Sequence, residues 1–136
     1  QIESDFLGIK KFRSKVRTAT IDSTAYKHAR HLGASFDDIC LLKLDLEGFE
    51  ARALEGAKRL LQTVRVVHFE FCPAYIRSHS VDLLNMFTSY GFTIYGSRNN
   101  APDVEERAYH PSEYDDLISL LSDRKYQGTD LVALKL

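Results

Sequence analysis

The fold of this chain is decided by LLKLDLEGFE, residues 41–50, an apolar run that ends in acidic residues and a glycine. The run predicts a buried strand at about residues 39–44, followed directly by a helix. In open α/β sheets, ligands bind outside the carboxyl ends of the strands. Asp45 and Glu47 are therefore candidates for chemistry at a strand end. The alternative is helix capping, because a carboxylate near a helix N-terminus accepts hydrogen bonds from free amides.

Outward from this stretch, apolar patterns of strand length alternate with patterns of helical spacing. Further strands are expected at about residues 16–21, 64–72, 92–96 and 130–136, and helices at about 23–32, 48–62, 80–90 and 112–122. Such alternation indicates βαβ units in a Rossmann-like, mostly parallel sheet with helices on both faces. We expect residues 1–136 to form a single, partial α/β domain, in which residues 1–15 are a connector without a clean apolar period.

Composition excludes several classes of protein. Lys and Arg number 18 against 19 Asp and Glu, a net charge of -1, which gives no basic surface for nucleic acid or an anionic membrane. No apolar stretch approaches the roughly 20 residues that a membrane span needs. Cys40 and Cys72 lie in or beside apolar runs and are typical of buried, reduced thiols. We therefore expect a soluble, intracellular protein, with the cytoplasm as its compartment.

A second group of polar residues lies on the strand expected at residues 64–72. His68, Glu70 and Cys72 share one face of it, because alternate residues point the same way. At a rise of ~3.3 Å per residue they are too far apart on a straight strand to bind one ion, so no metal site is expected. Glu70 is expected to face the same cleft as Asp45, or to pair with Lys43 on the neighbouring strand. An unpaired lysine would be costly to bury there.

Four ordered motifs resemble one protein family. They read TID at residues 20–22, LKLDLEGFE at 42–50, LEGA at 54–57 and HFE at 68–70. This order is similar to the C-terminal half of FkbM-type S-adenosylmethionine-dependent methyltransferases. The resemblance implies the C-terminal half of a class I methyltransferase fold, whose last strand runs antiparallel. It also implies that Asp45, Glu47 and Glu70 are the catalytic residues.

The resemblance further implies methyl transfer from S-adenosylmethionine to a hydroxyl of a small molecule or sugar. Asp22, Lys43 and Glu50 are the expected supporting residues, and for Asp22 helix capping is favoured over ligand contact. The glycine-rich loop that holds the cofactor in this family is not found among the seven glycines. The cofactor-binding residues are therefore unassigned, and the fragment is not expected to be active alone. Phe49 replaces the family's usual small residue and is expected to narrow the space beside Asp45.

Two interpretations remain open. In the first, the chain is the acceptor-side half of a methyltransferase, and a preceding segment or a partner chain completes the sheet. In the second, a catalytically inactive methyltransferase-like domain serves as a structural or interaction subunit of an assembly. A sheet cut at its middle would expose an apolar edge strand, so both interpretations predict that another segment pairs with that edge.

Overall fold

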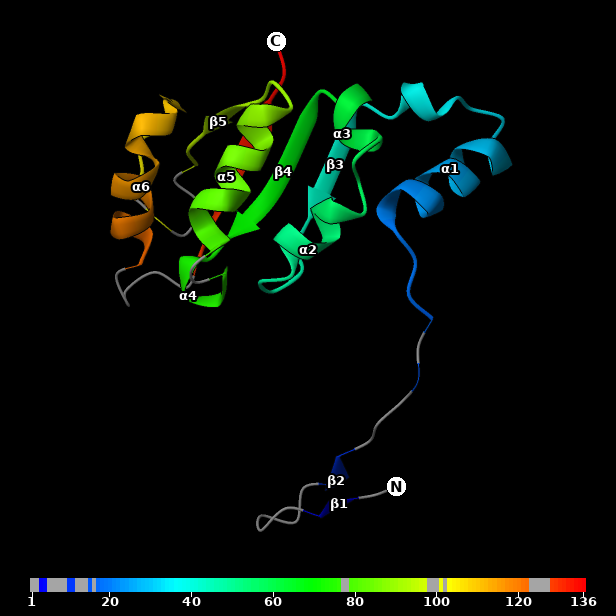
Figure 1. The fold of residues 1–136 in the computed structure, drawn as a ribbon, viewed down its shortest axis with the longest axis horizontal. Helices are drawn as coiled ribbons and strands as arrows, with labels where there is room; N and C mark the ends of the chain where they lie inside the picture. The colour runs from blue at the N-terminus through cyan, green and yellow to red at the C-terminus, as the bar shows by residue number, and fades with distance from the viewer. Residues whose placement is uncertain are drawn as a thin grey trace.

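The computed structural model describes residues 3–4, 10–11, 15, 17–76, 79–97, 101, 103–122 and 128–136. Its main feature is a five-stranded sheet, which Figure 1 shows with the surrounding helices. The strands are β3 (Leu41–Leu44), β4 (Val66–Phe71), β5 (Thr93–Tyr95), β6 (Ala108–Tyr109) and β7 (Thr129–Leu134). The α-helices are α1 (Ile21–His31), α2 (Glu50–Glu55), α3 (Leu60–Thr63), α4 (Pro73–Ile76), α5 (Ser80–Ser89) and α6 (Tyr114–Leu121), and two 3-10 turns are η1 (Phe36–Asp38) and η3 (Pro111–Glu113).

Most of the expected elements are present. The strands expected near residues 39–44, 64–72, 92–96 and 130–136 are confirmed as β3, β4, β5 and β7. Strand β6 was not expected, because it lies within a polar stretch that resembles a loop. In the expected connector, β1 (Glu3–Ser4) pairs antiparallel with β2 (Lys10–Lys11). Apart from residue 15, the other residues of that connector lie outside the described ones.

The sheet is mixed, with the order β3-β4-β7-β5-β6. Strand β3 runs parallel to β4, whereas β7 is antiparallel to both β4 and β5, and β6 is antiparallel to β5. The expected antiparallel last strand is confirmed. The expectation of a mostly parallel sheet needs correction, because insertion of β7 between β4 and β5 leaves β3 and β4 as the parallel pair among the described strands.

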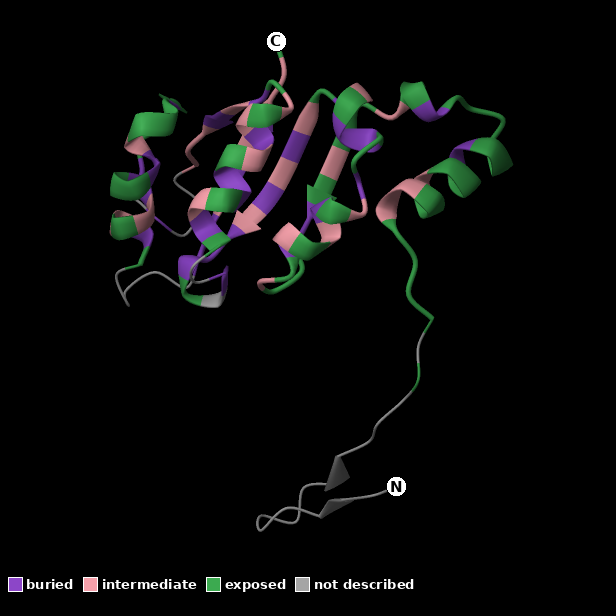
Figure 2. Cartoon of the chain, in the orientation of Figure 1, coloured by how far each residue is buried: buried purple, intermediate pink, exposed green. Residues whose placement is uncertain are grey.

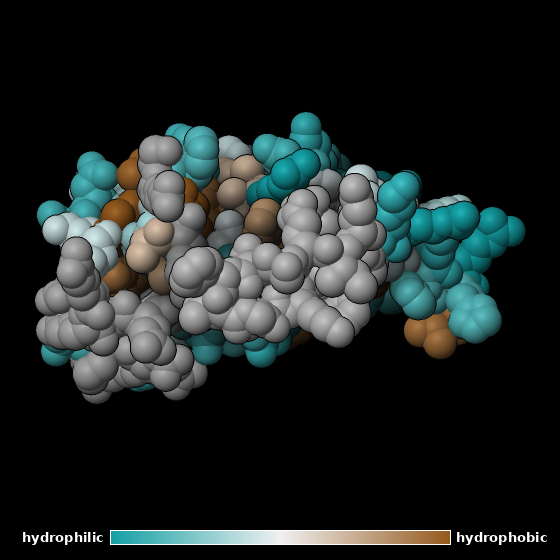
Figure 3. Space-filling view, turned by 90° about the horizontal axis from the view of Figure 1, so that it is seen from below, coloured by the Kyte–Doolittle hydropathy of each residue, from teal (hydrophilic) through white to brown (hydrophobic). Residues whose placement is uncertain are grey.

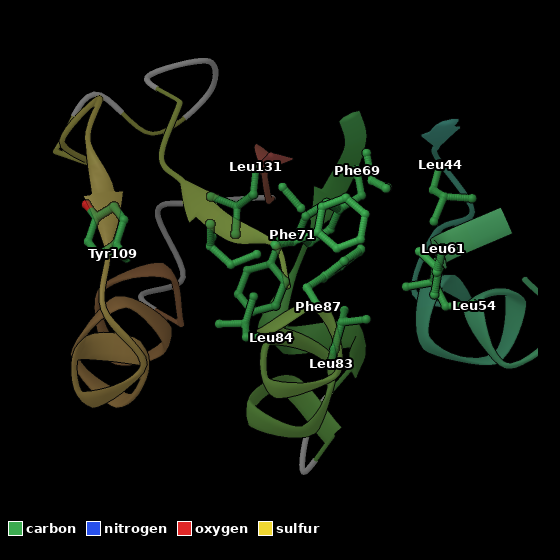
Figure 4. Packing of buried hydrophobic residues seen from close by; sticks show 14 of the residues in the cluster. Leu44, Leu54, Leu61, Phe69, Phe71, Leu83, Leu84, Phe87, Tyr109 and Leu131 are labelled. Atoms are coloured by element: carbon green, nitrogen blue, oxygen red, sulfur yellow. The ribbon is translucent and has the colours of Figure 1, made fainter. Parts of the chain in front are cut away.

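One face of the sheet carries the hydrophobic core. In β4, Val67, Phe69 and Phe71 are fully buried and alternate with half-buried residues, as the banding of β4 in Figure 2 shows. Figure 4 shows Phe69 and Phe71 among the core side chains between the strands and the helices. The rings of Phe69 and Phe87 of α5 stack with their centroids 4.7 Å apart.

The other face, which carries Val66, His68 and Glu70 of β4, is called the open face below. These residues are partly exposed, since the described helices pack on the opposite face. The expectation of helices on both faces is therefore wrong for the described residues. The alternation of polar and apolar residues along β4 is the physical reason, because polar side chains keep their hydration only on an uncovered face.

The strand expected at residues 16–21 is also wrong. Residues 17–20 form no strand, residue 16 lies outside the described ones, and helix α1 begins at Ile21. Thr20 is the N-cap: its side-chain oxygen accepts a hydrogen bond from the N–H of Ser23 at 3.2 Å. This capping bond explains why the helix begins at Ile21, two residues before the expected start at residue 23. Helix α1 buries only Ala29 and forms the hydrophilic end of the molecule in Figure 3.

The helix expected over residues 48–62 is divided into α2 and α3. Asp22 explains the second start, because its two carboxylate oxygens accept from the N–H groups of Arg59 and Leu60, both at 2.9 Å. Its own N–H donates to the carbonyl oxygen of Gly56 at 2.9 Å. Asp22 therefore caps a helix that begins 38 residues later, not the helix in which it lies. Among the described residues, no helix is long and apolar enough to cross a membrane.

We predict that Asp22→Ala lowers the free energy of unfolding by about 1–2 kcal/mol, because two amides at the start of α3 lose their acceptor. Asp22→Asn keeps one side-chain oxygen and is expected to lose less. Chemical denaturation followed by circular dichroism measures both variants. An Asp22→Ala chain as stable as the unsubstituted chain would contradict the capping role.

Candidate functional site

The candidate site lies where β3 and β4 end, and the register of the two strands determines its composition. Leu44 pairs with Phe69, and both side chains are buried in the core. One residue further along, Asp45 comes beside Glu70. Because successive side chains of a strand alternate between faces, this step directs both carboxylates toward the open face.

A tight turn adds Glu47 to these two residues. Glu47 and Gly48 both have left-handed backbone, with φ of 53° and 92°. This conformation is natural for glycine but disfavours a residue with a side chain by roughly 1–2 kcal/mol. One carboxylate oxygen from each of Asp45, Glu47 and Glu70 lies within 4.8 Å of the other two. The structure therefore brings together the three residues predicted to be catalytic, which we call the acid cluster.

Like charges meet in the acid cluster. Two unit charges about 5 Å apart repel by about 1 kcal/mol in water, and by more where solvent is excluded. Burial raises the pKa of Glu70 above its ordinary value of 4.5, and the charges of Glu47 and Asp45 raise it further. The charges of Glu50 and Asp130 act in the same direction. Glu70 is consequently a stronger proton acceptor than an ordinary glutamate.

Glu50 supports the turn from the protein interior. It is 1% exposed, and its Oε1 atom accepts a hydrogen bond from the N–H of Leu46 at 2.8 Å. This bond fixes the backbone between Asp45 and Glu47. The other oxygen, Oε2, is buried and has no hydrogen-bond partner among the described residues. The contact fits the supporting role predicted for Glu50 and leaves one buried carboxylate oxygen unsatisfied.

The remaining predicted residues lie at the rim of the acid cluster or away from it. Lys43 Nζ is 3.9 Å from Asp45 Oδ2, and their side chains are 59% and 60% exposed, so this ion pair contributes little stability. Lys43 thus approaches Asp45, not Glu70. Asp22 is committed to capping α3. Phe49 is 63% exposed and lines a groove along the outer edge of β3.

Strand β7 and the residue just before it contribute two residues that the sequence reasoning missed. Asp130 lies opposite Glu70 in the β4–β7 register, and its Oδ2 atom is 3.7 Å from Nε2 of His68. Gly128 has φ of 118°, and a Cβ atom there would lie 3.3 Å from Glu70 Oε1 and 3.1 Å from Cys72 Cβ. A glycine just before the last strand was the available signal for such a close approach.

Two cavities flank the acid cluster without being lined by it. A groove of about 740 Å³ follows the outer edge of β3 and reaches Leu46. A second cavity, of about 600 Å³, lies between α2 and α5 and reaches Gly48. Both volumes are in the range of small-molecule sites, roughly 300–1,000 Å³. The turn that carries Glu47 therefore borders two spaces large enough for the body of an acceptor.

The model of one protein family, the methyltransferase FkbM domain, matches residues 3–127. The chain belongs to the FkbM methyltransferase family. The resemblance seen in the four motifs is thereby confirmed. No curated protein and no solved structure matches the chain.

The described part of this FkbM-family domain does not fit a complete S-adenosylmethionine site. In Rossmann-like folds such a cofactor lies against a glycine-rich loop that follows a strand. No described strand of this chain leads into a loop with two glycines. What the described residues do form is a group of three carboxylates at strand ends.

We predict that Glu70→Gln stabilises the chain near pH 7 and that this gain disappears on acidification. The pKa of Glu70 is higher in the folded chain than its ordinary value of 4.5. As the pH rises from the ordinary pKa through the raised one, ionisation of Glu70 therefore lowers the stability of the folded chain. Below pH 4.5 the carboxyl is largely protonated in both states, and glutamine then resembles it. Thermal unfolding over a series of pH values measures the difference, with exposed Glu106→Gln as the control. A gain that grows on acidification would contradict the raised pKa.

Proposed function

We propose that the chain forms the acceptor side of an S-adenosylmethionine-dependent methyltransferase that modifies a hydroxyl of a small molecule or sugar. One observation carries the proposal: three carboxylates converge from the ends of two neighbouring parallel strands in a domain of the FkbM methyltransferase family. Carboxylates in this position hold a hydroxyl and accept its proton. The cofactor, when bound, supplies the methyl group.

Glu70 is the general base in this proposal. If S-adenosylmethionine were bound, the hydroxyl oxygen would displace S-adenosylhomocysteine from the methyl carbon, and the hydroxyl proton would pass to a nearby acceptor. The raised pKa of Glu70 makes its carboxylate a better acceptor than an ordinary one, because base strength rises with pKa. Glu70 also lies deeper than Asp45 and Glu47, which are exposed.

Asp45 and Glu47 bind the acceptor. A hydroxyl has a single proton, so one reacting hydroxyl cannot donate to all three carboxylates. The remaining two are placed to accept hydrogen bonds from neighbouring hydroxyls of the same molecule. This arithmetic favours a polyhydroxylated acceptor, such as a sugar, over an isolated alcohol. The cavity between α2 and α5, which reaches Gly48, leaves room for the rest of that molecule.

The alternative function is that of a structural or interaction subunit, and the outer edge of β3 favours it. Among the described strands, β3 pairs with β4 on one side and has no neighbour on the other. Leu41, Leu46 and Phe49 are 55%, 39% and 63% exposed. A free edge with apolar side chains pairs readily with another strand, supplied by a preceding segment or a partner chain. Pairing at this edge is compatible with both functions. A measurement of methyl transfer distinguishes them.

We predict that the gene product containing this chain binds S-adenosylhomocysteine and transfers methyl groups to hydroxylated acceptors. Calorimetry measures the binding, and labelled S-adenosylmethionine with a panel of sugars and glycosides measures the transfer. Glu70→Gln is expected to lower kcat by about 10²–10⁴-fold, the usual contribution of a general base. Asp45→Asn and Glu47→Gln are expected to raise KM for the acceptor. All three should leave the affinity for S-adenosylhomocysteine unchanged.

Asp115→Asn, an exposed substitution on α6, is the matched control and should change neither constant. An unchanged kcat in Glu70→Gln would contradict the assignment of the base. If neither the 136-residue chain nor any longer product of its gene bound the cofactor or transferred methyl groups, the enzyme proposal would fail and the assembly role would be favoured.

A further inference from the structure

We propose that Asp45, Glu47 and Glu70 bind a divalent cation, with buried Glu50 completing its surroundings. Each of the three residues offers one oxygen, and these oxygens lie within 4.8 Å of one another. Two ligands on opposite sides of one ion are separated by twice the metal–oxygen distance, about 4.2 Å for Mg²⁺ and about 4.6–5.2 Å for Ca²⁺. The spacing therefore accommodates Ca²⁺ directly, and Mg²⁺ after small movements of the exposed side chains.

The carboxylate of Glu50 is the independent feature that points to a ligand. Glu50 is 1% exposed, and its Oε2 atom has no hydrogen-bond partner among the described residues. A buried carboxylate is costly unless a cation or a hydrogen-bond donor satisfies each oxygen. The bond from Leu46 N–H to Oε1 places this side chain under the turn between Asp45 and Glu47, and its charge also acts on Glu70. The unsatisfied Oε2 atom therefore belongs to a buried carboxylate within electrostatic reach of Glu70, and a cation at the cluster would stabilise its charge.

The excess of negative charge around the acid cluster also favours a bound cation. Glu50 and Asp130 add two further carboxylates to the three of the cluster. The cation that approaches them among the described side chains, Lys43, is 3.9 Å from Asp45 and 59% exposed, so it neutralises only the rim. The strand register and the turn hold these like charges close to one another, although the charges repel. A divalent ion at their centre would relieve the repulsion.

The donor set indicates the class of ion. All the candidate ligand atoms are carboxylate oxygens, which suit the hard cations Mg²⁺, Mn²⁺ and Ca²⁺. The nearby imidazole of His68 is directed to Asp130, 3.7 Å away, so the cluster has no nitrogen ligand that would favour zinc or copper. The set of His68, Glu70 and Cys72 considered from the sequence differs from this one, because it drew every ligand from a single strand.

Cation binding does not depend on the proposed function, whereas a catalytic role for the cation rests on it. Glu70 as general base and Glu70 as cation ligand are separate roles, because a bound divalent cation lowers the basicity of a carboxylate. A cation held here would orient the acceptor hydroxyl as a Lewis acid.

The test is calorimetric titration of MgCl₂, MnCl₂ and CaCl₂ into the 136-residue chain at near-physiological ionic strength, without cofactor or acceptor. We expect saturable binding of one ion per chain, with Kd on the order of 10⁻⁴–10⁻³ M for such an exposed oxygen site. Asp45→Asn/Glu70→Gln should abolish binding, and Glu50→Gln should weaken it by about 10–100-fold, as loss of an outer ligand contact does. Asp115→Asn/Asp116→Asn removes the same charge from exposed α6 and should change nothing.

Thermal unfolding without added cation shows whether a variant that fails to bind the cation is still folded. The cluster double substitution should melt no lower than the unsubstituted chain, because it removes repelling charges. Glu47→Gly suits the left-handed backbone of that position and provides a second folded variant, which lacks the carboxylate of residue 47. Absence of saturable binding, or an equal loss in the α6 control, would overturn the proposal. Failure of methyl transfer would not affect this result, since the titration contains no substrate.

Discussion

The parallel register of β3 on β4 is the constraint on which the candidate site depends. Leu44 and Phe69 enter the core as a pair, and this pair determines the direction of the next residue on each strand. A slip of one residue would turn Asp45 into the core and Leu44 out of it. Burial of a large apolar side chain contributes about 1.5–3 kcal/mol, more than the roughly 1 kcal/mol of repulsion between two partly exposed carboxylates. The core therefore holds the acid cluster together against its own charge.

The four motifs of the FkbM family divide into two physical tasks. TID and LEGA meet away from the site, where Asp22 caps α3 and donates its own N–H to Gly56. LKLDLEGFE and HFE form the ends of β3 and β4 and carry the acid cluster with its buried support, Glu50. Loss of the capping contact of Asp22 lowers stability, whereas loss of the acid cluster changes the chemistry that the site can perform. An acidic residue within a family motif is therefore not by itself a candidate for catalysis.

The sequence predicted the convergence of Asp45, Glu47 and Glu70 because parallel strands end at the same edge of a sheet. It failed where a distant contact decides the local structure. Gly56 is a weak signal for the end of α2, but nothing near it announces the start of α3, because the capping carboxylate of Asp22 comes from far earlier in the chain.

Other errors had a signal in the sequence. The alternation along residues 67–71, VHFEF, already indicated a strand with one uncovered face, but the nearly unbroken apolar run of β3 suggested burial on both faces. The buried oxygen of Glu50 had no such signal, because it depends on the left-handed turn at Glu47.

The central claim is that the side chains at the ends of β3 and β4 form one site, whose carboxylate oxygens bind a ligand. The most direct measurement is the ¹H–¹⁵N spectrum of the chain during titration with Mn²⁺, whose unpaired electrons broaden the signals of nearby amides. The account predicts that broadening begins at residues 45–48 and 70–72 and at Gly128, which lies against Glu70. Broadening spread evenly over exposed acidic residues, including those of α6, would contradict it.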